Sequence, residues 1–144
     1  MRPTSEELAV WRLLHRAQVQ IAGRLEDDLM KAHDLPLASY EVLLRLSEAP
    51  GLRLRMNDLA HRVLLSRSGL TRLVDRLQRE GLVSREACES DARGLYAVLT
   101  AQGKARVEEA TPVYLRGIRR HFLDLLDPDD VGRCREMLAK LGVV

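Results

Sequence analysis

The hydrophobic pattern of the chain changes period at Gly81, and this change limits the possible folds more than any other feature. The apolar residues of segment 66–80 recur at the three- and four-residue spacing of one helix face: Leu70, Leu73, Val74 and Leu77. Ser66 is a residue type that caps helix starts, and Gly81 suits the left-handed position at a helix end. Beyond Gly81, the β-type runs LVSREAC and LYAVLT are separated by the turn-rich segment ESDARG. We therefore expect a capped helix that leads directly into a β-hairpin with a long, polar tip.

A second capped helix is expected just before Ser66. Asn57 is suited to cap the segment DLAHRVL, which ends near Leu65. Two capped helices joined by a few residues are typical of a helix-turn-helix. A shorter helix over residues 37–47 precedes this pair, and it is stopped by Pro50 and followed by the extended segment LRLR.

A long amphipathic segment opens the chain. Thr4 and Glu7 have the spacing of a capping box, and apolar residues then recur at threes and fours as far as Lys31. A second apolar stripe gives this segment more hydrophobic surface than one neighbouring element would cover. We therefore expect the helix to pack between two partners.

Two further helices are expected at the other end of the chain. Thr100 caps the first, which runs to about Leu126 and contains Pro112. A proline inside a helix requires either a kink or a restart, here with Thr111 as the new cap. Asp127, with the proline and acidic residues after it, begins the last helix.

The composition favours helices over sheets. Hydrophobic residues make up 46% of the chain but aromatic residues only 3%, so leucine, valine and alanine must build the core. The length of 144 residues is usual for one domain, and no repeat or long linker divides the chain. The expected fold is mainly α-helical with a small β-hairpin, in a single unit over residues 1–144.

Positive charge is concentrated in one part of the chain. Residues 53–85 hold eight arginines and only three acidic residues, although the net charge of the whole chain is only +2. Such a patch is typical of a protein that binds a phosphate backbone. A solvated charged face is the alternative interpretation.

The face of the arginine-rich helix opposite its leucines carries residues that could meet DNA: Arg67, Ser68, Thr71, Arg72, Asp75 and Arg79. A helix fits the major groove, where arginine can bind guanine as a fork and hydroxyls can bind bases or phosphates. The helix start at Ser66 adds free N–H groups and a positive dipole end, which suit phosphate. A surface helix with salt-bridged arginines is the alternative, but only Asp75 and Glu80 are locally available as partners. We therefore predict DNA contacts from Ser66, Arg67, Ser68, Thr71 and Arg72.

The expected hairpin supplies a second contact. Arg93 lies at its tip, from which a side chain can enter the narrow minor groove, and Asp91 can brace it. A loose salt bridge between the two residues is the alternative.

In this order and spacing, these motifs resemble the MarR family of bacterial winged-helix regulators. The family's hallmarks are a recognition helix that ends in a glycine and a wing with Asp-x-Arg before a Leu-Thr-x-x-Gly stretch. The matching positions in this sequence are Gly81, Asp91, Arg93, Leu99, Thr100 and Gly103. The resemblance extends over nearly the whole chain.

The resemblance implies a winged helix-turn-helix DNA-binding module at about 36–100 and dimerisation helices at about 4–33 and 101–144. It implies a homodimer whose recognition helices each read half of a pseudo-palindromic operator on double-stranded DNA. Such proteins are usually repressors, released by a small anionic or phenolic ligand bound between the dimer helices and the DNA-binding module. The sequence itself leaves open whether this chain represses or activates, and whether it has an effector.

Three residues could line this ligand cleft: Trp11, His15 and Tyr40. Core packing explains Trp11 equally well.

Among the cysteines, Cys88 is expected to be an exposed thiol, with its redox activity open, and Cys134 is expected to pack in the last helix.

Other functional classes find little support in the sequence. The four histidines lack metal-ligand spacing, so no metal is expected. The sequence contains no cofactor motif and no nucleophile paired with a base, so it does not indicate an enzyme. The absence of a secretory signal and of a long apolar run predicts a cytoplasmic protein. A winged helix that binds a protein partner instead of DNA is the alternative function.

Overall fold

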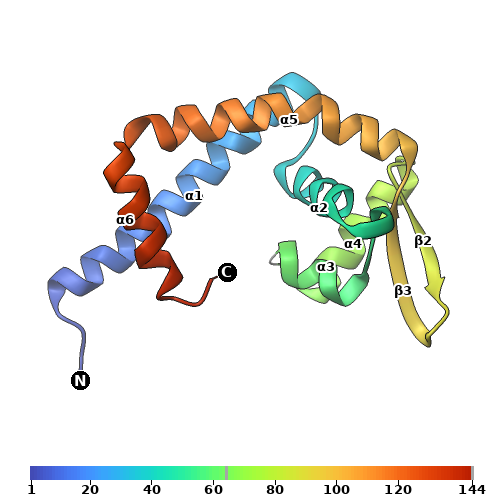
Figure 1. The fold of residues 1–144 in the computed structure, drawn as a ribbon, viewed down its shortest axis with the longest axis horizontal. Coiled ribbons are helices and arrows are strands. Elements are labelled where there is room, and N and C mark those ends of the chain that lie inside the picture. The colour runs from blue at the N-terminus through green and yellow to red at the C-terminus, as the bar shows by residue number, and fades with distance from the viewer. Residues whose placement is uncertain (64, 144) are drawn as a thin grey trace.

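The computed structural model describes residues 1–63 and 65–143, and the side chains of residues 91–93 lie outside that description. Six α-helices, two short 3₁₀ turns and three strands follow one another within this part of the chain (Figure 1). They are α1 (Ser5–His33), α2 (Leu37–Glu48), η1 (Pro50–Leu52), β1 (Arg53–Arg55), α3 (Met56–Val63), α4 (Arg67–Arg79), β2 (Val83–Cys88), β3 (Asp91–Leu99), α5 (Ala101–His121), η2 (Leu123–Leu125) and α6 (Pro128–Ala139). The prediction of a mainly helical fold with a small β-hairpin is confirmed.

Four helix starts carry the caps that the sequence predicts. In each, a side-chain oxygen accepts a hydrogen bond from the backbone N–H three residues later: Thr4, Ser66, Thr100 and Asp127. The prediction for Asn57 is wrong, because α3 begins at Met56 and includes Asn57 in its first turn. The chain passes from β1, which ends at Arg55, directly into this helix, so the helix starts one residue before the predicted cap.

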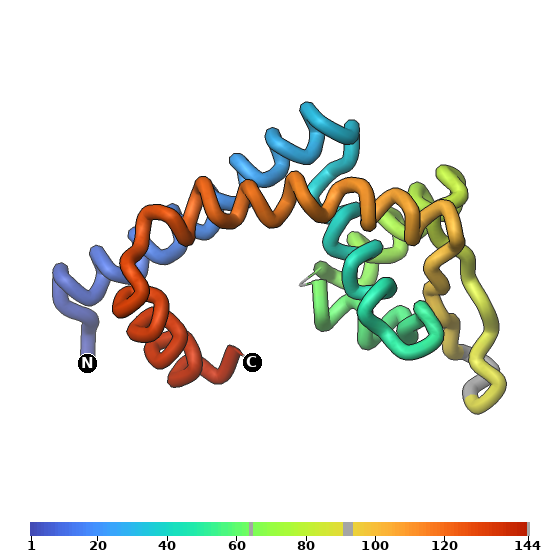
Figure 2. The backbone as a smooth tube through the Cα atoms, turned by 45° about the horizontal axis from the view of Figure 1, so that its top comes forward, coloured from blue at the N-terminus to red at the C-terminus, as the bar shows by residue number. Residues whose placement is uncertain are grey.

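Of the two outcomes expected at Pro112, a kink or a restart, the restart does not occur. The helix continues through Pro112 as one uninterrupted coil, which Figure 2 shows, and it ends at His121 rather than near Leu126. The Thr111 hydroxyl does not cap a new helix, because it donates to the backbone carbonyl of Val107 at 2.7 Å.

The three strands form one small antiparallel sheet in the order β1-β3-β2. Strand β1 pairs Arg53 with Val98, and β2 pairs Val83 with Leu99. The hairpin tip is shorter than predicted, because β2 ends at Cys88 and β3 already begins at Asp91. Some of the polar residues expected in a long tip thus belong to β3. A turn of two residues is enough to reverse the direction of the chain between β2 and β3.

The hydrophobic core is formed by side chains of α2, α3, α4, the base of the hairpin and part of α5. Tyr40, Leu43 and Leu46 of α2 have no exposed surface there. By contrast, residues 1–20 are all exposed, and α1 buries only Leu25 and Leu29. Figure 1 shows the consequence: α2, α3, α4 and the hairpin gather at one end of α5, while α1 and α6 extend away at the other. No helix of the described ranges is both long enough and apolar enough to cross a bilayer.

Candidate DNA-binding surface

Helix α4 has one buried face and one exposed face, as predicted. Its core residues are Leu70, Leu73, Val74 and Leu77. The opposite face is open to solvent and carries Arg67, Ser68, Thr71, Arg72 and Arg79. Five of the predicted DNA-binding residues, Ser66 included, therefore lie exposed along the start and outer face of one helix.

The start of α4 is built to present backbone N–H groups. The Ser66 hydroxyl accepts from the N–H of Gly69 at 3.1 Å and lies 3.3 Å from the hydroxyl of Ser68. A Cβ on Gly69 would lie only 3.0 Å from the Ser66 oxygen, so glycine keeps this cap close. The first N–H groups of a helix have no partner within the helix, and they form its positive end. This end of α4 is therefore suited to a phosphate group.

The carboxylates beside α4 are already engaged by two other arginines. Asp75 lies 2.7 Å from Arg85, which reaches over from β2. Glu80 lies 4.0 Å from Arg76, whose guanidinium also donates to the buried hydroxyl of Ser39 at 2.9 Å. The pairing of Asp75 with Arg85 was not predicted from the sequence.

The remaining arginines of α4 are not neutralised. Within the ranges that the structure describes, no ion pair joins a carboxylate to Arg67, Arg72 or Arg79. The alternative of a salt-bridged surface helix therefore does not fit this face, because the two nearby carboxylates are paired elsewhere.

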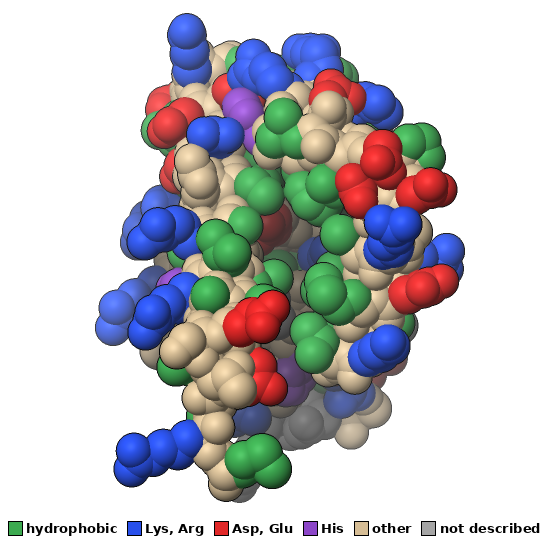
Figure 3. All heavy atoms as spheres, turned by 90° about the vertical axis from the view of Figure 1, so that its left-hand side faces the viewer, with side chains coloured by type: hydrophobic (Ala, Val, Ile, Leu, Met, Phe, Trp, Pro, Cys, Tyr) green, Lys and Arg blue, Asp and Glu red, His purple; other side chains and the backbone are tan. Residues whose placement is uncertain are grey.

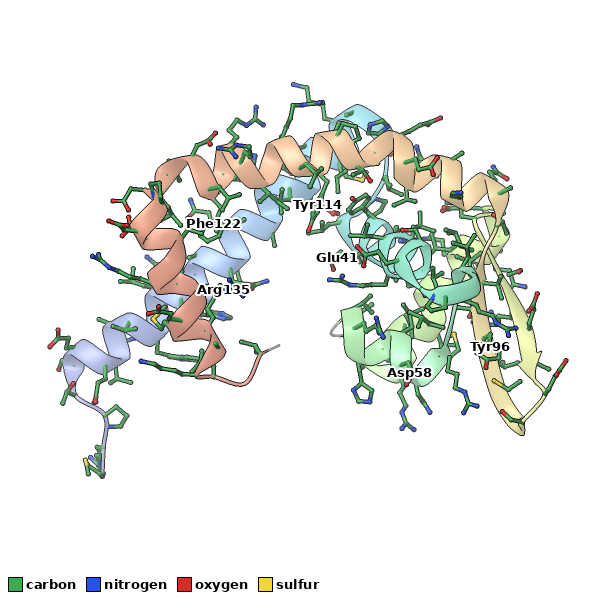
Figure 4. The ribbon with its side chains drawn as sticks, viewed as in Figure 1. Glu41, Asp58, Tyr96, Tyr114, Phe122 and Arg135 are labelled. Carbon is green, nitrogen blue, oxygen red and sulfur yellow. The ribbon has the colours of Figure 1, made fainter. Side chains whose placement is uncertain are left out.

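The two predicted wing residues, Asp91 and Arg93, belong to the first part of β3, and their side chains lie outside the described residues. Arg55, on the neighbouring strand β1, donates a hydrogen bond to the hydroxyl of Ser90 at 2.9 Å. Arg53 is held within the sheet, with its guanidinium 4.4 Å from the ring centre of Tyr96, which Figure 4 labels.

The three predicted ligand residues do not come together in a single chain. The rings of Trp11 and His15 are stacked with 6.4 Å between their centres, and both side chains are exposed. Tyr40 is completely buried, and its hydroxyl lies 3.1 Å from that of Thr111. Trp11 lies about 27 Å along α1 from Leu29, which shares the core with Tyr40.

Two polar residues that the sequence did not indicate lie at the junction of α2 and α5. Figure 4 labels Glu41 of α2 and Tyr114 of α5, which lie on the sides of these helices that face the concave part of the molecule. Burial raises the pKa of Glu41, although the charge of Arg45 acts against this. Burial, and after it the carboxylate of Glu41, raise the pKa of the Tyr114 hydroxyl. Only the packing of α2 against α5 brings these residues together, so no local sequence pattern could have found them.

The cysteines differ from expectation. Cys88 is buried, with 4% of its surface exposed, so the prediction of an exposed thiol is wrong. It lies at the end of β2 in a residue pair with Asp91, where the strand still belongs to the sheet. Cys134 is half-buried on α6. In the part of the chain that the structure describes, no three histidine, cysteine or acidic side chains gather as a metal site.

Comparisons with known proteins find similar regulators of transcription. A model of the MarR family matches residues 33–94. The crystal structure of AbsC, a MarR family transcriptional regulator from Streptomyces coelicolor, superposes with a TM-score of 0.89 at 37% sequence identity, covering 99% of this chain and 95% of AbsC. Sco3205, a second MarR family regulator of that organism, was solved in complex with DNA, and it matches with a TM-score of 0.90 at 32% identity over 99% of this chain and 89% of its own. The homoprotocatechuate degradative operon repressor of Escherichia coli is 34% identical over 82 residues, which are 57% of this chain and 54% of the repressor.

Proposed function

The chain belongs to the MarR family of DNA-binding transcriptional regulators, and from this premise we propose that it binds a pseudo-palindromic operator as a homodimer, with α4 of each protomer in the major groove. The observation that carries the proposal is the exposed face of α4, where three arginines without carboxylate partners among the described residues follow a capped helix start. The alternative of a winged helix that binds a protein partner is not supported, because the relative Sco3205 binds DNA.

The residues divide into roles by position. Ser66 and Ser68 lie at the helix start, where the free N–H groups and the hydroxyls would hold a phosphate. Thr71 and Arg72 lie one turn further on the exposed face, where they would meet base edges. Arg67 lies between these two groups and would reach either. We also assign Arg93 to the minor groove, supported by Asp91, as the hairpin sequence indicates.

A second copy of the chain would cover the surface that this protomer leaves open. The exposed apolar residues of α1 include Val10, Trp11, Leu13 and Val19, and those at the other end of the chain include Val131, Met137 and Leu141. Figure 3 looks at this side and shows hydrophobic side chains along its middle, with most of the Lys and Arg side chains toward its edges. An apolar surface of this extent is typical of an obligate interface.

We propose repression, with release by a small anionic or phenolic effector, as the mode of regulation. The relative from Escherichia coli is an operon repressor, which supports the first part. Two kinds of group favour a phenolic ligand in particular: the exposed stack of Trp11 on His15, and the half-buried Glu41 and Tyr114 beside the DNA-binding module, where the Glu41 carboxyl would accept from a phenol but repel an anion. Tyr40 has no exposed surface and could serve only as support behind Tyr114, whose ring centre lies 4.6 Å away. A bacterial DNA-binding regulator of this kind would act in the cytoplasm.

Footprinting on the DNA upstream of the protein's own gene tests the proposal. We expect two protected half-sites about one helical turn apart. The logarithm of the affinity should fall linearly with the logarithm of the potassium chloride concentration, by about 0.9 for each phosphate contacted. An affinity that does not change with salt would contradict the proposal, and so would a protein that stays monomeric while it binds.

A further inference from the structure

The side chain of Arg85 reaches from strand β2 to the recognition helix and makes three contacts there. Its guanidinium lies 2.7 Å from the carboxylate of Asp75, donates to the side-chain oxygen of Gln78 at 2.8 Å, and reaches the backbone carbonyl of Thr71 at 3.4 Å. Only 20% of the Arg85 side chain is exposed. These acceptors span about two turns of α4, so they fix this side of the helix at more than one point.

The connection made by Arg85 begins on a regular strand of the sheet and ends on the recognition helix α4. On the sheet, Arg85 pairs with Ala97 of β3, within the regular part of the hairpin. On the helix, one contact ends on the backbone of Thr71, and Thr71 is among the residues assigned to the DNA surface. A change in the angle between the hairpin and α4 would therefore move a residue that faces DNA.

We propose that Arg85 is a positioning residue, which holds the hairpin against α4 so that the two elements meet one duplex at a fixed spacing. The inference rests on the proposed function, because it requires both elements to contact DNA. Hydrogen bonds to base edges depend on direction, whereas attraction to phosphates depends mainly on charge. Loss of the connection should therefore reduce the preference for the operator more than the affinity for DNA in general.

Three variants separate positioning from charge. Arg85→Ala removes the whole connection, and Asp75→Asn breaks the ion pair while Arg85 keeps its charge. Arg53→Ala is the matched control, because Arg53 is an arginine of the same sheet whose contacts, with Glu86 at 3.6 Å and with Tyr96, both lie within the hairpin. The dissociation constant of each variant is measured for a duplex that the native protein selects from a random pool, and for a shuffled duplex of equal length and composition.

We expect Arg85→Ala and Asp75→Asn to lower the ratio of the two affinities by about tenfold, as the loss of one charge-assisted contact would. Arg53→Ala should leave the ratio unchanged, because it removes an arginine of the sheet without breaking a contact between the hairpin and α4. An equal loss on both duplexes for Arg85→Ala would make Arg85 a phosphate contact and overturn the inference. The inference would also be overturned if Asp75→Asn kept the affinity ratio of the native protein. If Arg85→Ala does not fold, the ratio of Asp75→Asn alone tests the inference. If the native protein itself has no preferred duplex, the proposed function fails and the inference fails with it.

Discussion

The arginines on and beside α4 have two different kinds of surroundings. Arg76 and Arg85 are bound to protein groups, on α2 and on α4 respectively. The others face solvent without a carboxylate partner in the described ranges: Arg67, Arg72 and Arg79. The sequence was sufficient to find the exposed face, because the leucine spacing determines which side of the helix is buried. It could not find the partner of Asp75, because nine residues and a change from helix to strand separate Asp75 from Arg85.

Arg72→Ala should weaken operator binding while the protein remains folded. A fork from arginine to guanine contributes about 1–3 kcal/mol, so the affinity should fall by roughly 5- to 150-fold. Fluorescence anisotropy with a labelled operator measures the loss. The control is Arg45→Ala, which removes a surface arginine paired with Glu48 on α2. Equal affinities of Arg72→Ala and the native protein would remove Arg72 from the residues that read bases.

Arg93→Ala should reduce the affinity for many duplexes by a similar factor. The minor groove distinguishes few base pairs, so a contact there contributes binding more than sequence preference. Comparison of binding to a panel of operator variants gives the measurement. A change of preference confined to one base pair would require a different role for the hairpin.

At the scale of the elements, the places where prediction failed share a physical cause. The caps at Thr4, Ser66, Thr100 and Asp127 depend on local geometry, and the sequence predicted them correctly. The start of α3, the length of the hairpin tip and the course of α5 through Pro112 depend on what the neighbouring element does. Such tertiary influence is absent from any short stretch of sequence.

Gly103 shows how closely two elements can approach. An added Cβ would lie 2.1 Å from the backbone oxygen of Leu82 and 2.7 Å from a side-chain carbon of Leu99. Gly103→Ala should therefore lower the free energy of unfolding by about 1–3 kcal/mol or more, which urea denaturation measures. The control is Gly132→Ala on α6, where an added Cβ meets nothing within 4 Å. This change should stabilise the helix by up to about 1 kcal/mol, and equal effects of the two substitutions would contradict the account.

The packing of α1 against α5 should depend on pH through Asp28. Burial disfavours the charged form, but the hydrogen bond from His121 and the charge of Arg120 outweigh it, so the pKa of Asp28 lies below its ordinary value of 3.8. The stabilisation is therefore complete above pH 3.8 and is lost as the pH falls through the lowered pKa.

Asp28→Asn should remove this part of the acid dependence. At neutral pH the variant should be less stable than the native protein by about 1 kcal/mol, the upper range for a partly exposed ion pair. The difference should shrink as the pH is lowered towards 2. Thermal unfolding across this pH range measures both effects, and parallel curves for the two proteins would exclude Asp28 as the titrating group.

At the scale of the whole molecule, the DNA-binding end and the two projecting helices differ in how they are stabilised. The DNA-binding end has its own buried core, whereas α6 contains no buried residue and the first part of α1 has none. The sequence indicated this difference, because its first helix carries two apolar stripes. The sequence interpretation grouped Trp11, His15 and Tyr40 in one cleft, whereas the single chain keeps the first two apart from the third.

Trp11→Glu should disrupt the proposed homodimer. Trp11 is 64% exposed in the single chain, and a charge at an apolar interface would lack a partner. We expect the dimer dissociation constant to rise by roughly 100-fold or more, with a parallel loss of operator binding. Sedimentation equilibrium measures the first and anisotropy the second. Trp11→Phe is the control, because it keeps an apolar aromatic side chain at this position and should leave the dimer intact. A dimer unaffected by Trp11→Glu would place the interface elsewhere.

The uncovered first part of α1 also affects the fate of a newly made chain. Before the proposed dimer forms, each chain would present about four turns of helix with large apolar side chains to the cell. Chaperones and proteases recognise such surfaces, so unassembled copies should be held or degraded soon after synthesis. Cellular quality control would then keep the pool of regulator almost entirely in its assembled form.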